Sequence, residues 1–184
     1  SQPASLNGKT TQNGLPAVTG ESEVEWTKEI SAYRMILGYR NKGHLVAKTN
    51  PIRERKNRQA NLELNFFGLA DTDFDTEFEA GKFANLGRTT LRNILAHLQK
   101  CYTHHVGIEI SYINDTEKTD WLINAMEKTL QEPVSIPQKK RILQKLNEGV
   151  MFEKFLHTKY IGQKRFSLEG GETTIAALDA ILDT

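Results

Sequence analysis

Three side chains that ligate metals or carry out nucleophilic chemistry lie together in the stretch CYTHH. Cys101, His104 and His105 supply one thiol and two imidazoles, which are groups that zinc prefers. A closed zinc site needs four ligands in spaced pairs, and this stretch offers only three. The same side chains could pair a cysteine nucleophile with a histidine base, but no orienting third residue is evident. We interpret Cys101 as a packed thiol, with metal binding and nucleophilic catalysis as the alternatives.

Another histidine follows a tyrosine and an arginine in the stretch YRNKGHL. His44 stands directly after Gly43, and a glycine permits close approach of the backbone. Imidazole titrates near neutral pH and serves readily in sites. We interpret His44 as a buried, hydrogen-bonded structural residue, with a role in a site as the alternative.

The stretch KRFSLEGGE, residues 164–172, combines two cations, an aromatic ring, acids and two glycines. It matches neither GxxxxGK[ST] nor GxGxxG, so it is not one of the known phosphate loops. The glycines precede a predicted helix whose free amides could hold an anion, but Glu169 and Glu172 would repel one. Local chemistry therefore predicts a turn that leads into a helix, and it leaves Phe166 unexplained.

The stretch RERKNR, residues 53–58, is the strongest run of positive charge in the chain. It is short and lacks the aromatic residues on which nucleic acid bases stack. We interpret it as a solvated loop. RNA binding, which salt would weaken steeply, is the alternative.

Helical spacing of apolar residues predicts most of the elements that position these groups. Ser22 and Glu25 have the spacing of a capping box, so we expect a long helix from Ser22 to about Lys48, before Asn50-Pro51. Its predicted apolar face consists of Trp26, Ile30, Tyr33 and Leu37. Further helices are predicted near Thr72, over Thr90 to Thr103, from Asn114 or Asp115 to Pro133, from Ser135 to Gly149, over Val150 to Tyr160, and from about Glu172.

Strict alternation of apolar residues over 106–113 (VGIEISYI) predicts a single strand. The fold class is therefore mainly α, an irregular helical bundle of about six helices with one isolated or minor strand. Residues 1–20 contain no aromatic residue and few aliphatic ones, so they are expected to form a flexible amino-terminal tether.

Composition fits one globular domain with a tail. The 184 residues are 38% hydrophobic and 26% charged, as in ordinary globular proteins. With 24 basic and 23 acidic residues, no global field favours nucleic acid or membrane binding. No apolar run approaches the roughly 20 residues that cross a bilayer. A single cysteine fits a reducing compartment.

Several stretches, in the same order along residues 32–182, resemble the decarboxylating first component of the 2-oxoglutarate dehydrogenase complex. The most specific is KLNEGVMFEKFLHTKYIGQKRFSLEGGET, residues 145–173. AYRMILGYRNKGHLVAKTNPI is similar to the family's YR..GHL...DPL helix, with Asn50 where aspartate is usual. FGLADTDFDTEF resembles GL...D.D..F, and VGIEISYI followed by DWL resembles G.EY.HI and a Trp-Leu pair.

The resemblance implies an amino-terminal piece of such an enzyme. The sequence contains neither the family's Gly-Asp-Gly cofactor motif nor its HRGRLN segment, whose histidine handles substrate. A tether at 1–22, a helical domain at 23–160 and the start of the thiamine diphosphate-binding domain at 161–184 are expected. In the family the aromatic of KRFSLEGG lines the 2-oxo acid pocket, so Phe166 is the one expected substrate-binding residue. Anchoring of the domain junction is the alternative for this ring.

By the same resemblance, the intact protein uses thiamine diphosphate and Mg²⁺ to decarboxylate 2-oxoglutarate in the tricarboxylic acid cycle, and transfers succinyl to a lipoyl group. This piece alone is expected to bind no cofactor and to be inactive. The expected partners are the dihydrolipoyl succinyltransferase core and a second copy in a homodimer, in the bacterial cytoplasm. The alternative is a non-catalytic module that docks this core through residues 1–22. The sequence does not separate 2-oxoglutarate from 2-oxoadipate as substrate.

Overall fold

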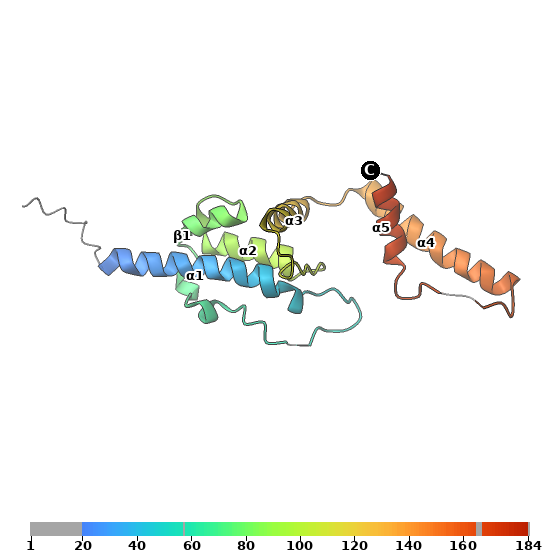
Figure 1. The fold of residues 1–184 in the computed structure, drawn as a ribbon, viewed down its shortest axis with the longest axis horizontal. Coiled ribbons are helices and arrows are strands. Elements are labelled where there is room, and N and C mark those ends of the chain that lie inside the picture. Colours follow the sequence, from blue (N-terminus) through green and yellow to red (C-terminus); the bar gives the residue numbers. More distant parts are fainter. Residues whose placement is uncertain (1–19, 57, 165–166, 184) are drawn as a thin grey trace, which may run out of the picture. The chain divides into compact units, whose positions relative to one another are not determined.

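The computed structural model describes residues 20–56, 58–164 and 167–183, with the side chains of 20–24 left out. It divides into two compact units, Ser1–Gln131 and Glu132–Thr184. The α-helices are α1 (Gly20–Lys42), α2 (Leu91–Tyr102), α3 (Thr116–Thr129), α4 (Ile136–Lys159) and α5 (Thr173–Leu182) (Figure 1). Short 3-10 helices are η1 (Gly43–Leu45), η2 (Leu64–Phe67), η3 (Asp71–Asp73) and η4 (Glu79–Ala84). The predicted mainly helical class is confirmed.

The first unit contains the only strands among the described residues. Strand β1 (Glu77–Phe78) pairs antiparallel with β2 (Thr89–Thr90), and Phe78 lies opposite Thr89. The predicted strand at 106–113 is wrong, since this segment has no strand pairing. Its Ile110 is buried, but Tyr112 is 75% exposed. An alternating pattern makes a strand only where a neighbouring strand offers its backbone groups.

Helix α1 buries a different face from the one predicted. Trp26 and Ile30 are 68% and 56% exposed, so the predicted face is wrong as a core face. The buried residues of α1 are Ser31, Ala32, Met35, Ile36 and Tyr39. Both sets have helical spacing, and packing selects the second, whose Ser31 and Ala32 are small. The selected face joins a core that also contains Phe67, Phe78, Leu91, Ile94, Leu98 and Tyr102.

The long helix ends earlier than Lys48. Helix α1 stops at Lys42, and η1 follows. A β-carbon at Gly43 would lie 2.5 Å from Cβ of Tyr102 and 3.0 Å from its carbonyl oxygen. Gly43 therefore lets the end of α1 approach the end of α2, and the chain turns away there. α1 begins at Gly20, two residues before the predicted start, and residues 1–19 of the predicted tether lie outside the described residues.

Side chains of α1 hold two neighbouring 3-10 helices. The Glu29 carboxylate accepts hydrogen bonds from the backbone N–H groups of Glu79 and Ala80 at 2.8 and 3.0 Å. It thereby satisfies free donors at the start of η4. Lys28 forms an ion pair with the buried Asp73 of η3. Figure 1 shows α2 running alongside α1. Helix α1 thus contacts α2, η3 and η4 and organises the packing of the first unit.

Most predicted helix starts in the rest of the chain are confirmed. Thr90 caps α2, Asp115 caps α3, and Ser135 caps α4 in a capping box with Gln138. The predicted end at Gly149 is wrong, because α4 runs on to Lys159. A β-carbon at Gly149 would lie 2.5 Å from Cδ1 of Ile175 in α5. This glycine marks a helix contact and not a helix end.

The second unit consists of α4 and α5, joined by residues 160–172. The Arg141 guanidinium contacts Asp179 at 2.6 Å and also pairs with Asp183. Lys145 lies 3.6 Å from Asp179. No side chain of α4 or α5 is fully buried, so the two helices are held together largely at the surface. None of the described helices is long and apolar enough to span a bilayer.

Candidate functional site

The predicted substrate-binding residue, Phe166, lies outside the described residues. Its described neighbours are Lys164, Ser167 and Leu168. These neighbours belong to the segment that connects the end of α4 at Lys159 to the start of α5 at Thr173. The contacts of these neighbours therefore define what the structure says about this candidate site.

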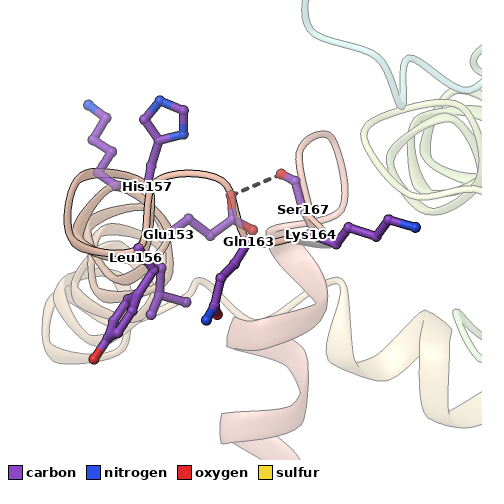
Figure 2. Close-up of a pocket in the computed structure, with 8 residues that line it drawn as sticks. Glu153, Leu156, His157, Gln163, Lys164 and Ser167 are labelled. Atoms are coloured by element: carbon purple, nitrogen blue, oxygen red, sulfur yellow. Dashed lines mark hydrogen bonds between the residues drawn. The ribbon is translucent and has the colours of Figure 1, made fainter.

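Glu153 of α4 holds the segment just after position 166. The hydroxyl of Ser167 donates to its Oε2 at 2.9 Å, and the backbone N–H of Leu168 donates to its Oε1 at 2.7 Å. Figure 2 shows the Glu153–Ser167 bond as a dashed line between helix and loop. Both bonds are to an ionised acceptor, and such bonds are stronger than neutral ones. The bond from Leu168, and then the one from Ser167, lower the pKa of Glu153.

A tight turn follows this anchor and leads into α5, as predicted. The N–H of Gly171 donates to the carbonyl oxygen of Leu168 at 2.6 Å, and the N–H of Glu169 donates to Oγ of Ser167 at 2.9 Å. Gly170 has a φ of +86°, a conformation that glycine adopts without strain. The turn thus fixes the chain after Ser167 through its own backbone as well as through Glu153.

An open cavity of about 490 Å³ lies between the last turns of α4 and this segment. Its lining residues are Glu153, Lys154, Leu156, His157, Tyr160, Gln163, Lys164 and Ser167. In Figure 2 the side chain of Lys164 extends away from α4, whereas Glu153 points to the loop. Lys154 and Lys164 are the positively charged lysines of this lining, and the carboxylate of Glu153 is occupied by its two hydrogen bonds. In this cavity the Glu153 carboxylate therefore holds the loop in place, and this role suits it better than proton transfer.

A second polar cluster is buried in the first unit around Glu127 of α3. Its carboxylate accepts from the hydroxyl of Tyr102 at 2.5 Å. Nε and Nη2 of Arg40 donate to Oε1 and Oε2 at 3.0 and 3.2 Å. Nε2 of His97 lies 3.6 Å from Oε2. One side chain of α3 is thereby tied to both α1 and α2.

Opposite charges set the protonation of this cluster. Burial raises the pKa of Glu127, but its bonds from His97, Tyr102 and Arg40 outweigh burial and leave the pKa lowered. Contacts with Cys101 and Glu127 raise the pKa of His97 to about 9. Burial and the bond to Glu127 raise the pKa of Tyr102 as well. The cluster thus holds charges that are nearly excluded from water, and such charges persist only when paired.

Comparison with known proteins identifies the family of this chain. No family model matches it. Over 159 residues it is 42% identical to the multifunctional 2-oxoglutarate metabolism enzyme of Mycolicibacterium vanbaalenii, a match that covers 85% of this chain and 13% of that protein. It is 39% identical over 162 residues to the 2-oxoglutarate dehydrogenase E1/E2 component of Corynebacterium glutamicum, again with 85% and 13% covered. The chain belongs to the 2-oxoglutarate dehydrogenase family. The predicted resemblance is confirmed.

This member of the 2-oxoglutarate dehydrogenase family spans only 13% of the length of those relatives. Activity, substrates and partners of the whole protein are therefore proposals. The domain limits predicted at residues 22 and 160 stay a prediction.

The structure separates the predicted CYTHH group. Cys101 is buried beside His97, with Sγ 3.9 Å from Nε2, whereas His104 and His105 are exposed and contact each other ring to ring. Cys101 is thus the packed thiol of our first interpretation. In the described part of the chain, no group of three or more His, Cys, Asp or Glu could hold a metal ion.

His44 and the RERKNR stretch contact each other in the structure. Nδ1 of His44 is buried and has no hydrogen-bond partner among the described residues, so the predicted hydrogen bond is wrong for this atom. The described residues of 53–58 are exposed, as expected for a solvated loop. Arg55 donates to the carbonyl oxygens of His44 and Leu45 at 2.9 and 3.1 Å, which ties this loop back to η1.

Sequence reasoning missed Glu153, Arg40, His97 and Glu127. One available signal was spacing, because His97 and Cys101 stand four residues apart on a predicted helix and share a face. Glu127 stands likewise four residues after Ile123, and both are buried. The partners from other helices had no signal in a single sequence, since their meeting depends on tertiary packing.

Proposed function

We propose that this chain is an amino-terminal segment of a thiamine diphosphate-dependent 2-oxoglutarate dehydrogenase. The intact enzyme decarboxylates 2-oxoglutarate and transfers the succinyl group to a lipoyl group. The observation that carries the proposal is the identity of 39–42% over 85% of the chain to proteins named for 2-oxoglutarate metabolism.

The residues of this chain do not fit the cofactor. The sequence has no Gly-Asp-Gly motif, and the described residues contain no cluster of three or more His, Cys, Asp or Glu that could hold Mg²⁺. Thiamine diphosphate supplies carbanion chemistry where it binds, and we assign no step of it to these residues. The proposed role of this chain in catalysis is to present Phe166 as one wall of the 2-oxo acid pocket. Alone, the chain is proposed to be inactive.

The test is turnover by the full-length protein. Purified full-length protein with thiamine diphosphate, Mg²⁺ and an electron acceptor should release carbon dioxide from 2-oxoglutarate, and the 184-residue chain under the same conditions should not. Parallel assays with 2-oxoadipate decide the preferred chain length. Turnover by the short chain would refute its proposed inactivity, and absence of turnover of both substrates by the full-length protein would refute the enzyme assignment.

A docking role is the second candidate. One relative is named as an E1/E2 component, which favours contact with a succinyltransferase core. Two large apolar residues of α1, Trp26 and Ile30, are exposed and border an open groove of about 650 Å³ with Phe83. If the chain retains the core in a pull-down and loses it after deletion of residues 1–22, the tether makes the contact. If Trp26→Ala alone abolishes retention, the groove makes it, and no retention by any form excludes docking.

The homodimer and the bacterial cytoplasm are proposals of the same kind. The relatives compared above are bacterial proteins, and one buried free cysteine suits a reducing compartment. Sedimentation of the full-length protein tests the dimer, because a monomer at micromolar concentration would contradict it.

A further inference from the structure

Helix α1 presents a row of large apolar side chains on the face that it turns away from the core. Trp26 and Ile30 are both largely exposed, and the half-buried Tyr33 continues the row. These residues stand four and three positions apart, which is the spacing of the seam between two packed helices. Tryptophan is among the residues most enriched at the centres of protein interfaces. An exposed row of this composition indicates a surface that another element contacts.

This row forms one wall of an open groove of about 650 Å³. The other wall is η4, which contributes Ala80 and Phe83. The rings of Tyr33 and Phe83 join the two walls, with their centroids 4.6 Å apart. An apolar groove beside a helix is a form of site that accepts an amphipathic helix from another protein.

Hydrogen bonds from α1 fix η4 (Glu79–Ala84) in its place. The Glu29 carboxylate accepts from the N–H groups of Glu79 and Ala80, and Nη2 of Arg40 donates to the carbonyl oxygen of Phe83 at 2.6 Å. Both the start of η4 and a residue near its end are therefore tied to α1. The two walls keep their spacing before any partner arrives, and a preformed site binds at a lower entropic cost.

The lining of the groove carries more negative than positive charge. Its charged residues are Glu25, Glu29, Glu79 and Lys82. Lys82 pairs with Glu79 at 2.5 Å, and Arg88 lies 3.8 Å from the same acid. Glu25 is exposed, and Glu29 accepts from uncharged backbone groups. No cation of the described lining therefore compensates Glu25 and Glu29.

This charge distinguishes between the possible occupants of the groove. A second copy of the chain would bring the same acids against each other in a symmetric contact, and like charges placed together oppose binding. A helix that carries lysine or arginine beside its apolar residues would instead match both the apolar row and the acids.

We propose that the groove between α1 and η4 binds a basic amphipathic helix of a partner protein. Its apolar side chains lie against Trp26, Ile30 and Phe83, and its cations lie beside Glu25 and Glu29. The inference deepens the docking candidate above, on which it rests for the existence of a partner, and it names the chemistry of the segment that docks.

A fluorescence titration tests this chemistry. The chain contains two tryptophans, Trp26 and Trp121, so Trp121→Phe leaves Trp26 as the single reporter. The probe is a synthetic helix-forming peptide of about five turns, with leucine along one face and lysine on both flanks. We expect saturable binding that shifts the emission of Trp26 to shorter wavelength, because the indole leaves water. A peptide with glutamate in place of lysine, and a lysine peptide of scrambled order, should produce no such shift.

Two pairs of variants in this background separate the groove from the rest of the surface. Phe83→Ala should weaken binding about tenfold, whereas Phe66→Ala, at an exposed ring outside the lining, should not. Glu25→Lys should weaken it about fivefold, whereas Glu109→Lys, at an exposed acid outside the lining, should not. If Phe83→Ala unfolds, Ile30→Ala takes its place, because Ile30 is exposed.

The other occupants give different results. Self-association of the chain in sedimentation that Trp26→Ala abolishes would assign the groove to a second copy. Slower oxidation of Trp26 by hydroxyl radicals in the full-length protein than in the 184-residue chain would assign it to another part of the same polypeptide. Either result, or equal binding of the lysine and glutamate peptides, would overturn the inference. A succinyltransferase core that is not retained would refute docking of that core, while the titration would still decide the groove.

Discussion

The two units differ in that only the first, among the described residues, contains a buried cluster of charged side chains. In the first unit the side chains of Glu127 and His97 are 3% and 8% exposed, and they join three helices inside the protein. In the second unit Arg141 and Asp183 are 45% and 57% exposed, and they join two helices at the surface. Surface pairs are screened by water and contribute little, whereas buried pairs are costly to break.

The apolar residues follow the same division. The first unit has a continuous core in which Met35, Leu91 and Tyr102 are fully buried. The helices of the second unit leave Phe152 and Leu178 62% and 54% exposed. A unit with little buried apolar surface has little stability of its own. We therefore expect the first unit to respond sharply to changes in its interior, and the second to respond weakly to changes in its pairs.

The largest effect should come from breaking the buried cluster. Arg40→Met leaves Glu127 buried without the guanidinium that donates two hydrogen bonds to it, and removing one member of a buried pair costs about 3–5 kcal/mol. Urea unfolding followed by circular dichroism, with hydrogen exchange of α2 amides, measures this loss in the first unit. Arg88→Met, at an exposed pair with Glu77, is the matched control and should change nothing measurable.

A double variant sharpens this result. Glu127→Gln added to Arg40→Met removes the carboxylate charge that has lost its guanidinium partner, but keeps an oxygen for Tyr102. It should therefore be more stable than Arg40→Met alone. If the double variant is the less stable of the two, the carboxylate charge left without Arg40 is not the cause of the loss.

The next effect compares two glycines, one in each unit. A β-carbon at Gly43 meets Tyr102 at its Cβ and its backbone oxygen, so Gly43→Ala forces α2 to shift and should cost about 1–3 kcal/mol. At Gly149 the β-carbon meets the side chain of Ile175, whose Cδ1 lies 2.5 Å away and can rotate away. Alanine also favours the helix by up to about 1 kcal/mol.

The Gly149→Ala variant should therefore be near neutral in the same urea experiment. Equal losses for the two alanine variants would contradict the contrast between a rigid first unit and a yielding second unit.

The sequence predicted where helices form better than it predicted which face of a helix is buried. Caps at Thr90, Asp115 and Ser135 depend on residues three positions apart, and such local rules survive without tertiary context. The buried face of α1 was missed because two faces have helical spacing, and only the packing of η4 and α2 distinguishes them. The predicted helix end at Gly149 was wrong for the same reason, since the residue that this glycine contacts comes from α5.

The site was predictable only through the family. Phe166 came from the resemblance and not from local chemistry, and the structure supplies Glu153 as the residue that holds its neighbours. A glutamate within a helix has no local signal for a contact fourteen residues away. The Glu127 cluster was missed likewise, because its members stand on three different helices.

The third prediction concerns pH and uses the raised pKa of His97. A raised pKa means that its contribution to stability is complete below pH 6.5 and is lost as pH rises through about 9. Nδ1 of His97 faces the amide nitrogen of Gln131 at 3.1 Å, and a charged ring needs an acceptor there, which reduces the effect.

We therefore expect the first unit to lose on the order of 1–2 kcal/mol over that pH range. Urea unfolding at several pH values measures it, and His97→Gln should flatten the dependence. A dependence that survives in His97→Gln would assign it to another group.

The smallest effect should come from the surface pairs of the second unit. Arg141→Met removes contacts with Asp179 and Asp183, and α5 should exchange its amide hydrogens faster. Because salt screens exposed pairs, high salt should bring the unmodified chain close to the variant, whereas it should not do so for Arg40→Met in the first unit. Lys139→Met, at an exposed cation two residues earlier, is the control. If salt leaves the difference between Arg141→Met and the unmodified chain unchanged, Arg141 acts by packing its stem on α5, and the second unit is held as the first is.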